Sequence, residues 1–195
     1  MKMKKISTLL CLAALSVVSA HGASVLWALG AGGLKTVGAL DPSTGSYSDG
    51  SANLSNATLY FLLGSTSTAD VKKAFGDKGL DVSSLEGLKL LDTASSNAGG
   101  AKAAGSTPVS DDAISTGKNA FSVIAVTSVD STYFFKLLSG EQSGYDPSAV
   151  PAQPKTTMNF SANTVKGVAW TAVPEPATAA LALLGLGLMI KRRKA

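Results

Sequence analysis

The segment Phe121-Ser-Val-Ile-Ala-Val-Thr-Ser-Val129, followed after three residues by Tyr133-Phe-Phe-Lys-Leu-Leu138, decides the fold class of this chain. The first segment is rich in β-branched residues and is apolar on both faces at its centre. Such a pattern is typical of a core strand that is covered on both sides. Because so few residues separate the two segments, they predict an antiparallel β-hairpin.

Other short apolar segments lie on both sides of this hairpin and predict further strands. Turn signals separate them, among them Asp41-Pro42-Ser43-Thr44-Gly45 and Asp49-Gly50. The predicted strands cover residues 25–30, 57–63, 157–160 and 165–173, with Val25, Trp27 and Leu29 on one face of the first and Val168, Trp170 and Ala172 on one face of the last.

Helical signals are weaker than strand signals. Thr68 or Asp70 is placed to cap a short helix over residues 71–75 that stops at Gly76. Residues 94–105 are small or polar and predict a mobile loop, and residues 145–154 predict a second loop. We therefore expect a mainly β fold, an antiparallel β-sandwich or jelly-roll-like body with one or two short helices.

The charge of the chain is concentrated at its ends. The 195 residues carry a formal net charge of +4. Between His21 and Val173, however, the chain has 10 lysines, 12 acidic residues and no arginine. A body with this balance offers no basic patch and no guanidinium for phosphate binding, so we expect no nucleic-acid partner.

The N-terminus is typical of a secretory signal peptide. A basic region over residues 1–5 precedes an apolar region over residues 6–18. Val18-Ser19-Ala20 then supplies the small residues that signal peptidase recognises. We predict export through the Sec machinery and cleavage after Ala20, with Ala23 as the second choice. Cys11 lies in the removed segment, so the mature chain would contain no cysteine.

The C-terminus combines three features in a fixed order. Pro174-Glu175-Pro176 precedes an apolar run over residues 177–190, and the run is followed by Lys191, Arg192, Arg193 and Lys194. As a helix this run would span about 21 Å, which is short for a bilayer core of about 30 Å. Long basic side chains can extend from the end of a short helix to the membrane interface, so we still expect a membrane helix here. Because lysine and arginine are retained on the cytoplasmic side, its basic end should lie in the cytoplasm.

These C-terminal residues resemble a PEP-CTERM protein-sorting tail. The resemblance rests on residues 173–176, the Leu-Leu-Gly-Leu-Gly-Leu run at residues 183–188 and the basic terminus. It implies a tail that a membrane-embedded exosortase recognises, with the body passed to the cell surface or an exopolysaccharide matrix. The expected domains are a signal peptide (1–20), a β-rich extracytoplasmic body (21–173) and the sorting tail (174–195), so that the body is flanked by an N-terminal signal helix and a C-terminal transmembrane helix. A plain, unprocessed single-pass envelope anchor is the alternative.

The body is poor in residues for catalysis. His21 is the only histidine, which disfavours a Ser-His-Asp triad and a histidine-based zinc site. The glycine-rich residues 30–36 lack the glycine and lysine spacing of a phosphate-binding loop. The acidic segments 41–49 and 111–112 do not match a calcium-binding loop. We therefore predict a protein that is not an enzyme, with no cofactor and no metal.

Two alternatives to a surface or matrix role remain open. A carbohydrate-binding module for polysaccharide would use exposed aromatic rings, for which the candidates are Trp27, Tyr60, Tyr133, Phe134, Tyr145 and Trp170. A small hydrolase would need two carboxylates about 5 to 10 Å apart in a cleft. Glu86 and Glu141 are the only glutamates of the body.

Overall fold

The computed structural model describes residues 24–108, 118–143, 156–160 and 168–173. The predicted signal peptide with Ala20 and Ala23, the sorting tail from Pro174 and the predicted membrane segment 177–190 lie outside these residues. So do Tyr145, the predicted loop at 145–154 and the acidic pair at 111–112. Within the described ranges, no helix is both long enough and apolar enough to cross a bilayer.

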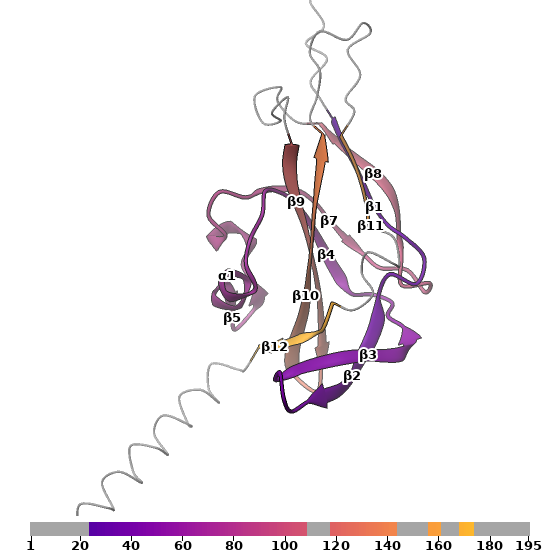
Figure 1. The fold of residues 1–195 in the computed structure, drawn as a ribbon, viewed down its shortest axis with the longest axis vertical. Helices are drawn as coiled ribbons and strands as arrows, with labels where there is room; N and C mark the ends of the chain where they lie inside the picture. The colour runs from indigo at the N-terminus through magenta and orange to yellow at the C-terminus, as the bar shows by residue number, and fades with distance from the viewer. Residues whose placement is uncertain (1–23, 109–117, 144–155, 161–167, 174–195) are drawn as a thin grey trace, which may run out of the picture.

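The predicted hairpin is confirmed and forms the centre of a five-stranded sheet (Figure 1). Strand β9 (Lys118–Val129) pairs antiparallel with β10 (Thr132–Ser143), and Val129 faces Thr132 across the reversal. The connecting Asp130 and Ser131 have φ values of 47° and 65°. Positive φ at both central positions is the geometry of a type I′ turn, whose twist matches that of the strands.

Three more strands complete this sheet in the order β12-β10-β9-β4-β7. Strand β4 (Thr58–Leu63) lies between β9 and β7 (Lys89–Ser95) and is antiparallel to both. The short strand β12 (Thr171–Val173) pairs antiparallel with β10 at the other edge, where Val173 faces Tyr133. The last described residues of the chain are therefore held by the central hairpin.

A second sheet packs against the first through the main hydrophobic core. Its central strand β1 (Ser24–Leu29) pairs antiparallel with β8 (Lys102–Pro108) and parallel with β11 (Thr156–Phe160). As predicted, Val25, Trp27 and Leu29 are buried on one face of β1. The Trp27 ring stacks on Phe61 of β4 with centroids 4.1 Å apart. The fold is thus mainly β and largely antiparallel, whereas a sandwich or jelly-roll architecture stays a prediction.

A hairpin of β2 (Lys35–Asp41) and β3 (Ser46–Asn53) lies next to β12 at one end of the five-stranded sheet (Figure 1). The predicted turn at Asp41 joins its strands, and Asp41 Oδ1 accepts hydrogen bonds from the backbone N–H and the hydroxyl of Ser43. Two backbone hydrogen bonds of 2.8 Å between Tyr47 and Trp170 connect β3 to the residue before β12.

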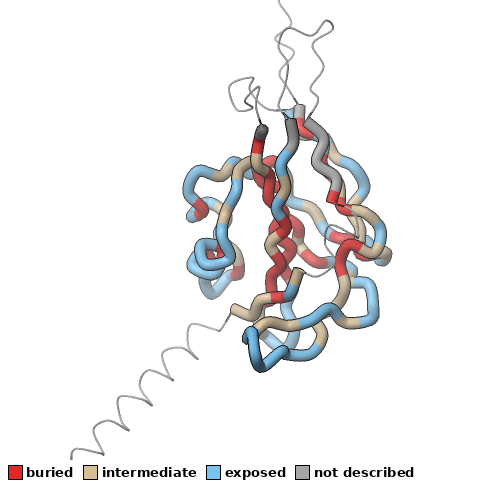
Figure 2. The backbone as a smooth tube through the Cα atoms, in the orientation of Figure 1, coloured by how far each residue is buried: buried red, intermediate tan, exposed pale blue. Residues whose placement is uncertain are grey.

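The opposite face of the five-stranded sheet is covered by a small helical segment. It comprises α1 (Thr68–Lys73), the short strands β5 (Phe75–Gly76) and β6 (Gly79–Leu80), and the 3₁₀ turn η1 (Val82–Ser84). Val71, Ala74 and Leu85 pack there against residues of β4, β9 and β10. Figure 2 shows buried residues following the central strands, as expected for a sheet that is covered on both faces.

Three local predictions were wrong. The predicted loop at 94–105 is confined to residues 96–101, because β7 extends to Ser95 and β8 begins at Lys102. The small residues serve packing: a Cβ on Gly105 would lie 2.3 Å from Trp27 Cζ2. Asp49-Gly50 is not a turn but the middle of β3. The cap of α1 is Ser67 instead of Thr68 or Asp70.

Candidate functional site

The sorting residues predicted from the sequence follow directly on the described fold. Val173 is the last residue of β12, and Pro174, Glu175 and Pro176 come next in the chain, outside the described residues. The basic residues Lys191, Arg192, Arg193 and Lys194 also lie outside them. The last strand of the body therefore ends at the residue immediately before the Pro-Glu-Pro tripeptide.

The two tryptophans of the body belong to the core. Trp27 is 3% exposed and Trp170 is fully buried. Phe134 is also buried, and Tyr47 meets it edge-to-face with ring centroids 5.0 Å apart. Tyr60 and Tyr133 are partly buried on the opposite side of the sheet, where Tyr133 lies 5.8 Å from the Phe75 ring. The structure thus leaves neither tryptophan available to stack on a sugar.

A polar cleft of about 390 Å³ lies beside α1. It is lined by Ser65, Thr66, Asp70, Lys73, Ala74, Ser84, Leu85 and Glu86, so it brings Glu86 together with a second carboxylate, Asp70. Glu141 lies on β10 opposite Ala120.

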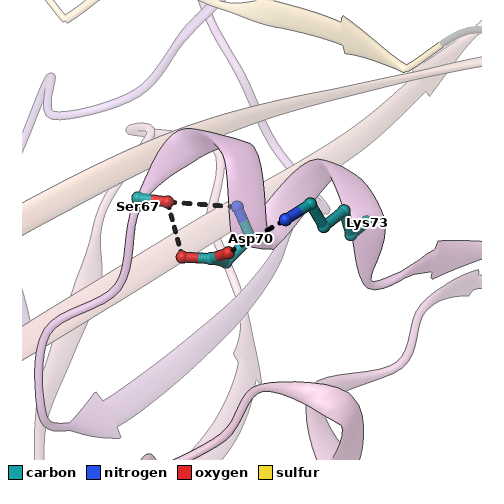
Figure 3. A network of polar contacts seen from close by, with 3 residues as sticks. All are labelled: Ser67, Asp70 and Lys73. Atoms are coloured by element: carbon teal, nitrogen blue, oxygen red, sulfur yellow. Dashed lines mark hydrogen bonds and ion pairs between the residues drawn. The ribbon is translucent and has the colours of Figure 1, made fainter.

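The carboxylate of Asp70 is engaged in capping α1 (Figure 3). Ser67 Oγ donates a 2.6 Å hydrogen bond to Asp70 Oδ2, and the Asp70 backbone N–H donates a 3.1 Å hydrogen bond to Ser67 Oγ. The Ser67 hydroxyl, aided by the Lys73 ammonium 3.7 Å away, holds the pKa of the Asp70 carboxyl below its ordinary value. A catalytic acid in a glycosidase needs a raised pKa instead, so Asp70, which supports the Ser67 cap, is poorly suited to protonate a leaving group.

The main core contains a charged residue that the sequence interpretation did not single out. Lys136 of β10 has a side chain with 0% exposure, and its Nζ forms an ion pair with Oδ1 of Asp49 on β3, whose side chain is 30% exposed. The ammonium also lies 5.2 Å from the centroid of the Trp170 ring, which is the geometry of a cation–π contact. We call these three residues the lysine cluster.

The alternation of side chains along β10 and β3 explains how the lysine cluster forms. Side chains two residues apart share a strand face, so Lys136 lies on the face of Phe134, and Asp49 lies on the face of Tyr47. Phe134 meets Tyr47, and the next contact along the same two strands is Lys136 with Asp49.

The indole nitrogen of Trp170 is buried in the same cluster. In the described part of the chain, this Nε1 has no hydrogen-bond acceptor.

A signal for this cluster was present in the sequence. Lys136 stands in the apolar run Tyr133–Leu138, on the face that carries two core residues. A charge in that position requires a buried partner of opposite sign. What the sequence could not supply was the partner, because Asp49 lies 87 residues away and was interpreted as a turn residue.

Asp41 and Asp49, which a calcium-binding interpretation would bring together, are engaged by different groups. Asp41 accepts hydrogen bonds from Ser43 at the β2–β3 turn, and Asp49 pairs with Lys136. The Ser43 hydroxyl and backbone N–H keep the pKa of the Asp41 carboxyl below its ordinary value. In the residues that the structure describes, no group of three or more acidic, histidine or cysteine side chains is arranged to hold a metal ion.

Comparison with known protein families identifies the C-terminal segment. Residues 172–194 match the family model of the PEP-CTERM protein-sorting motif. The chain carries a PEP-CTERM sorting motif. This motif implies exosortase-dependent sorting of an exported surface protein. The match begins at Ala172, so the PEP-CTERM motif overlaps the last two residues of β12. No curated protein and no solved structure matches the chain.

Proposed function

We propose that this chain is a non-enzymatic protein of the cell surface or the extracellular matrix. Its signal peptide directs export, and its C-terminal helix holds it in the inner membrane until an exosortase-like protease processes the tail. The observation that carries the proposal is the PEP-CTERM motif at residues 172–194. The remaining domain then acts outside the membrane as a β-rich body.

The chemistry of the tripeptide supports its recognition by a protease. Pro174 and Pro176 each fix φ and lack an N–H donor, so they keep the segment extended and separate from the helix that follows. Glu175 then presents a single carboxylate at the membrane surface, which a cationic group of the protease can bind.

The body offers support of its own for a non-enzymatic role. The cleft beside α1 contains Asp70 and Glu86, but the Asp70 carboxylate is engaged by Ser67, the N-cap of α1. Burial of Trp27 and Trp170 removes the two strongest aromatic candidates for sugar binding. Both features favour a structural surface protein over a hydrolase or a carbohydrate-binding module.

The test compares the mass of the protein in separate membrane and extracellular fractions of its native host. We expect a precursor in the membrane and a body outside it that has lost both ends. Glu175→Gln keeps the size of the side chain and removes its charge, so it should leave export intact and retain the tailed form in the membrane. Asp77→Asn, an exposed site in the body, is the matched control and should be processed normally.

Two outcomes would contradict the proposal. Normal processing of the Glu175→Gln variant would show that the tripeptide carboxylate is not recognised. A wild-type protein found solely in the membrane with its tail attached would make the chain an unprocessed envelope anchor.

A further inference from the structure

We propose that Lys136 and Asp49 form an intramolecular isopeptide bond, with Nζ of Lys136 joined to Cγ of Asp49. The lysine cluster supplies the amine, the carboxyl group and a site in which the amine is shielded from water. This proposal concerns the body of the chain and does not depend on how the tail is processed.

The first argument is proximity. Nζ of Lys136 already contacts Oδ1 of Asp49, and packing holds both residues in place. Lys136 is fixed by the pairing of β10 with β9, where it faces Ala125, while Asp49 is fixed in β3 opposite Val37. Holding two reacting groups in this way replaces a collision with a unimolecular step and corresponds to an effective concentration of about 10⁵ M or more. Such a concentration favours condensation over hydrolysis.

The second argument is charge. The Lys136 side chain has no exposed surface, so its ammonium has given up its hydration, and among the described residues it is compensated by the Asp49 carboxylate and the Trp170 ring. A buried ion pair loses through desolvation much of what it gains by attraction. Transfer of one proton from Nζ to the carboxylate neutralises both groups, so that the buried nitrogen no longer carries a charge in the core. The resulting amine is a nucleophile, and the resulting carboxylic acid is its electrophile.

The reaction balances without a further reactant. The Nζ lone pair attacks Cγ of the Asp49 carboxylic acid, and the C–N bond forms. One carboxyl oxygen then leaves as water, taking its own proton and one from the attacking nitrogen. The product is a neutral secondary amide, and the released water can leave through the part of Asp49 that is exposed, 30% of its side chain.

A second Lys–Asp pair among the described residues serves as an internal control. Lys73 and Asp70 are separated by 3.7 Å on α1, but their side chains are 80% and 57% exposed. Water stabilises both charges there, and the two flexible side chains are not held together. We therefore expect no bond at this pair.

The bond would connect parts of the chain that no disulfide can connect. It would join residues 87 positions apart and attach the β2–β3 hairpin covalently to β10. Strand β10 also pairs with β12, after which the PEP-CTERM tripeptide begins. The mature chain predicted from the sequence has no cysteine, so a Lys–Asp amide would take the place of a disulfide cross-link.

The experiment is mass spectrometry of the purified full-length chain, first intact and then digested with trypsin. The intact mass should be lower than the sequence mass by one water molecule, after any loss of the signal peptide is included. Trypsin should fail to cut after Lys136. Peptide 36–72, which contains Asp49, should then appear joined to peptide 119–155.

Variants assign the bond to this pair. Lys136→Arg and Asp49→Ala should each restore the full sequence mass, whereas Lys73→Arg and Asp70→Ala should keep the deficit of one water. Recovery of the wild-type peptides 36–72, 119–136 and 137–155 as separate species, with no mass deficit, would overturn the proposal. Because that result needs the wild-type chain alone, a variant that fails to fold does not prevent the test.

Discussion

Two Lys–Asp pairs in the described part of this protein have the same chemistry and opposite environments. Lys136 and Asp49 meet between β10 and β3 in the main core, and the lysine has no exposed surface. Lys73 and Asp70 lie on the surface of α1, three residues apart in one helix. The core pair connects distant parts of the chain, whereas the surface pair completes a local helix cap.

The comparison teaches that the environment of an ion pair determines what it does. A surface pair is screened by water and contributes at most about 1 kcal/mol to stability. In the core pair, the Lys136 ammonium needs the Asp49 carboxylate, because without it the charge of the lysine would be buried without compensation. The following experiments test this difference, and the largest effect is expected at the core pair.

Lys136→Ala should be the most destabilising of these changes. It removes three methylene groups and the ammonium from the core and leaves Asp49 without its partner, which together should lower the free energy of unfolding by about 3 kcal/mol. Lys136→Met keeps most of the packing and should lose less. Urea denaturation measures both, and Lys73→Ala is the control. A loss at Lys136 no larger than that at Lys73 would contradict the view that the core pair is structural.

The strongly patterned parts of the fold could be predicted from the sequence. The hairpin of residues 121–138 is apolar over a long stretch. In β1, every second residue faces the core, namely Val25, Trp27 and Leu29. In both regions local pattern and burial agree, so the prediction does not depend on distant partners. The PEP-CTERM motif was recognisable for a similar reason, since its three parts are contiguous.

The missed features depend on contacts between distant residues. Gly105 and its small neighbours have the composition of a loop, yet they form β8 because the Trp27 ring needs the space beside a glycine. Asp49-Gly50 has the composition of a turn, yet Asp49 faces Lys136 and Gly50 lies against Thr36, whose Oγ1 would be 2.3 Å from an added Cβ. No local pattern in the sequence specifies such partners.

The helix cap at the surface pair should have an intermediate effect on stability. In Ser67→Ala, the backbone N–H of Asp70 loses the hydroxyl oxygen that accepts its hydrogen bond. Loss of an N-cap acceptor typically costs about 1 kcal/mol, which urea denaturation can resolve. Ser67→Asp retains an acceptor and should keep most of the stability. An unchanged midpoint for Ser67→Ala would indicate that α1 is held by the packing of Val71 and Ala74 alone.

The smallest effect should be the response of the surface pair to pH. The pKa of the Asp70 carboxyl lies below its ordinary value, and the hydrogen bond from Ser67 is the largest cause, ahead of the charge of Lys73. Because the folded-state pKa is lowered, this contribution to stability is present above about pH 4 and is lost as the pH falls through the folded-state value. Carbon-detected NMR titration of the Asp70 carboxyl should therefore show a larger upward shift in Ser67→Ala than in Lys73→Ala. The reverse order would mean that the ammonium, and not the hydroxyl, stabilises the carboxylate, so that the surface pair would resemble the core pair more closely than its exposure implies.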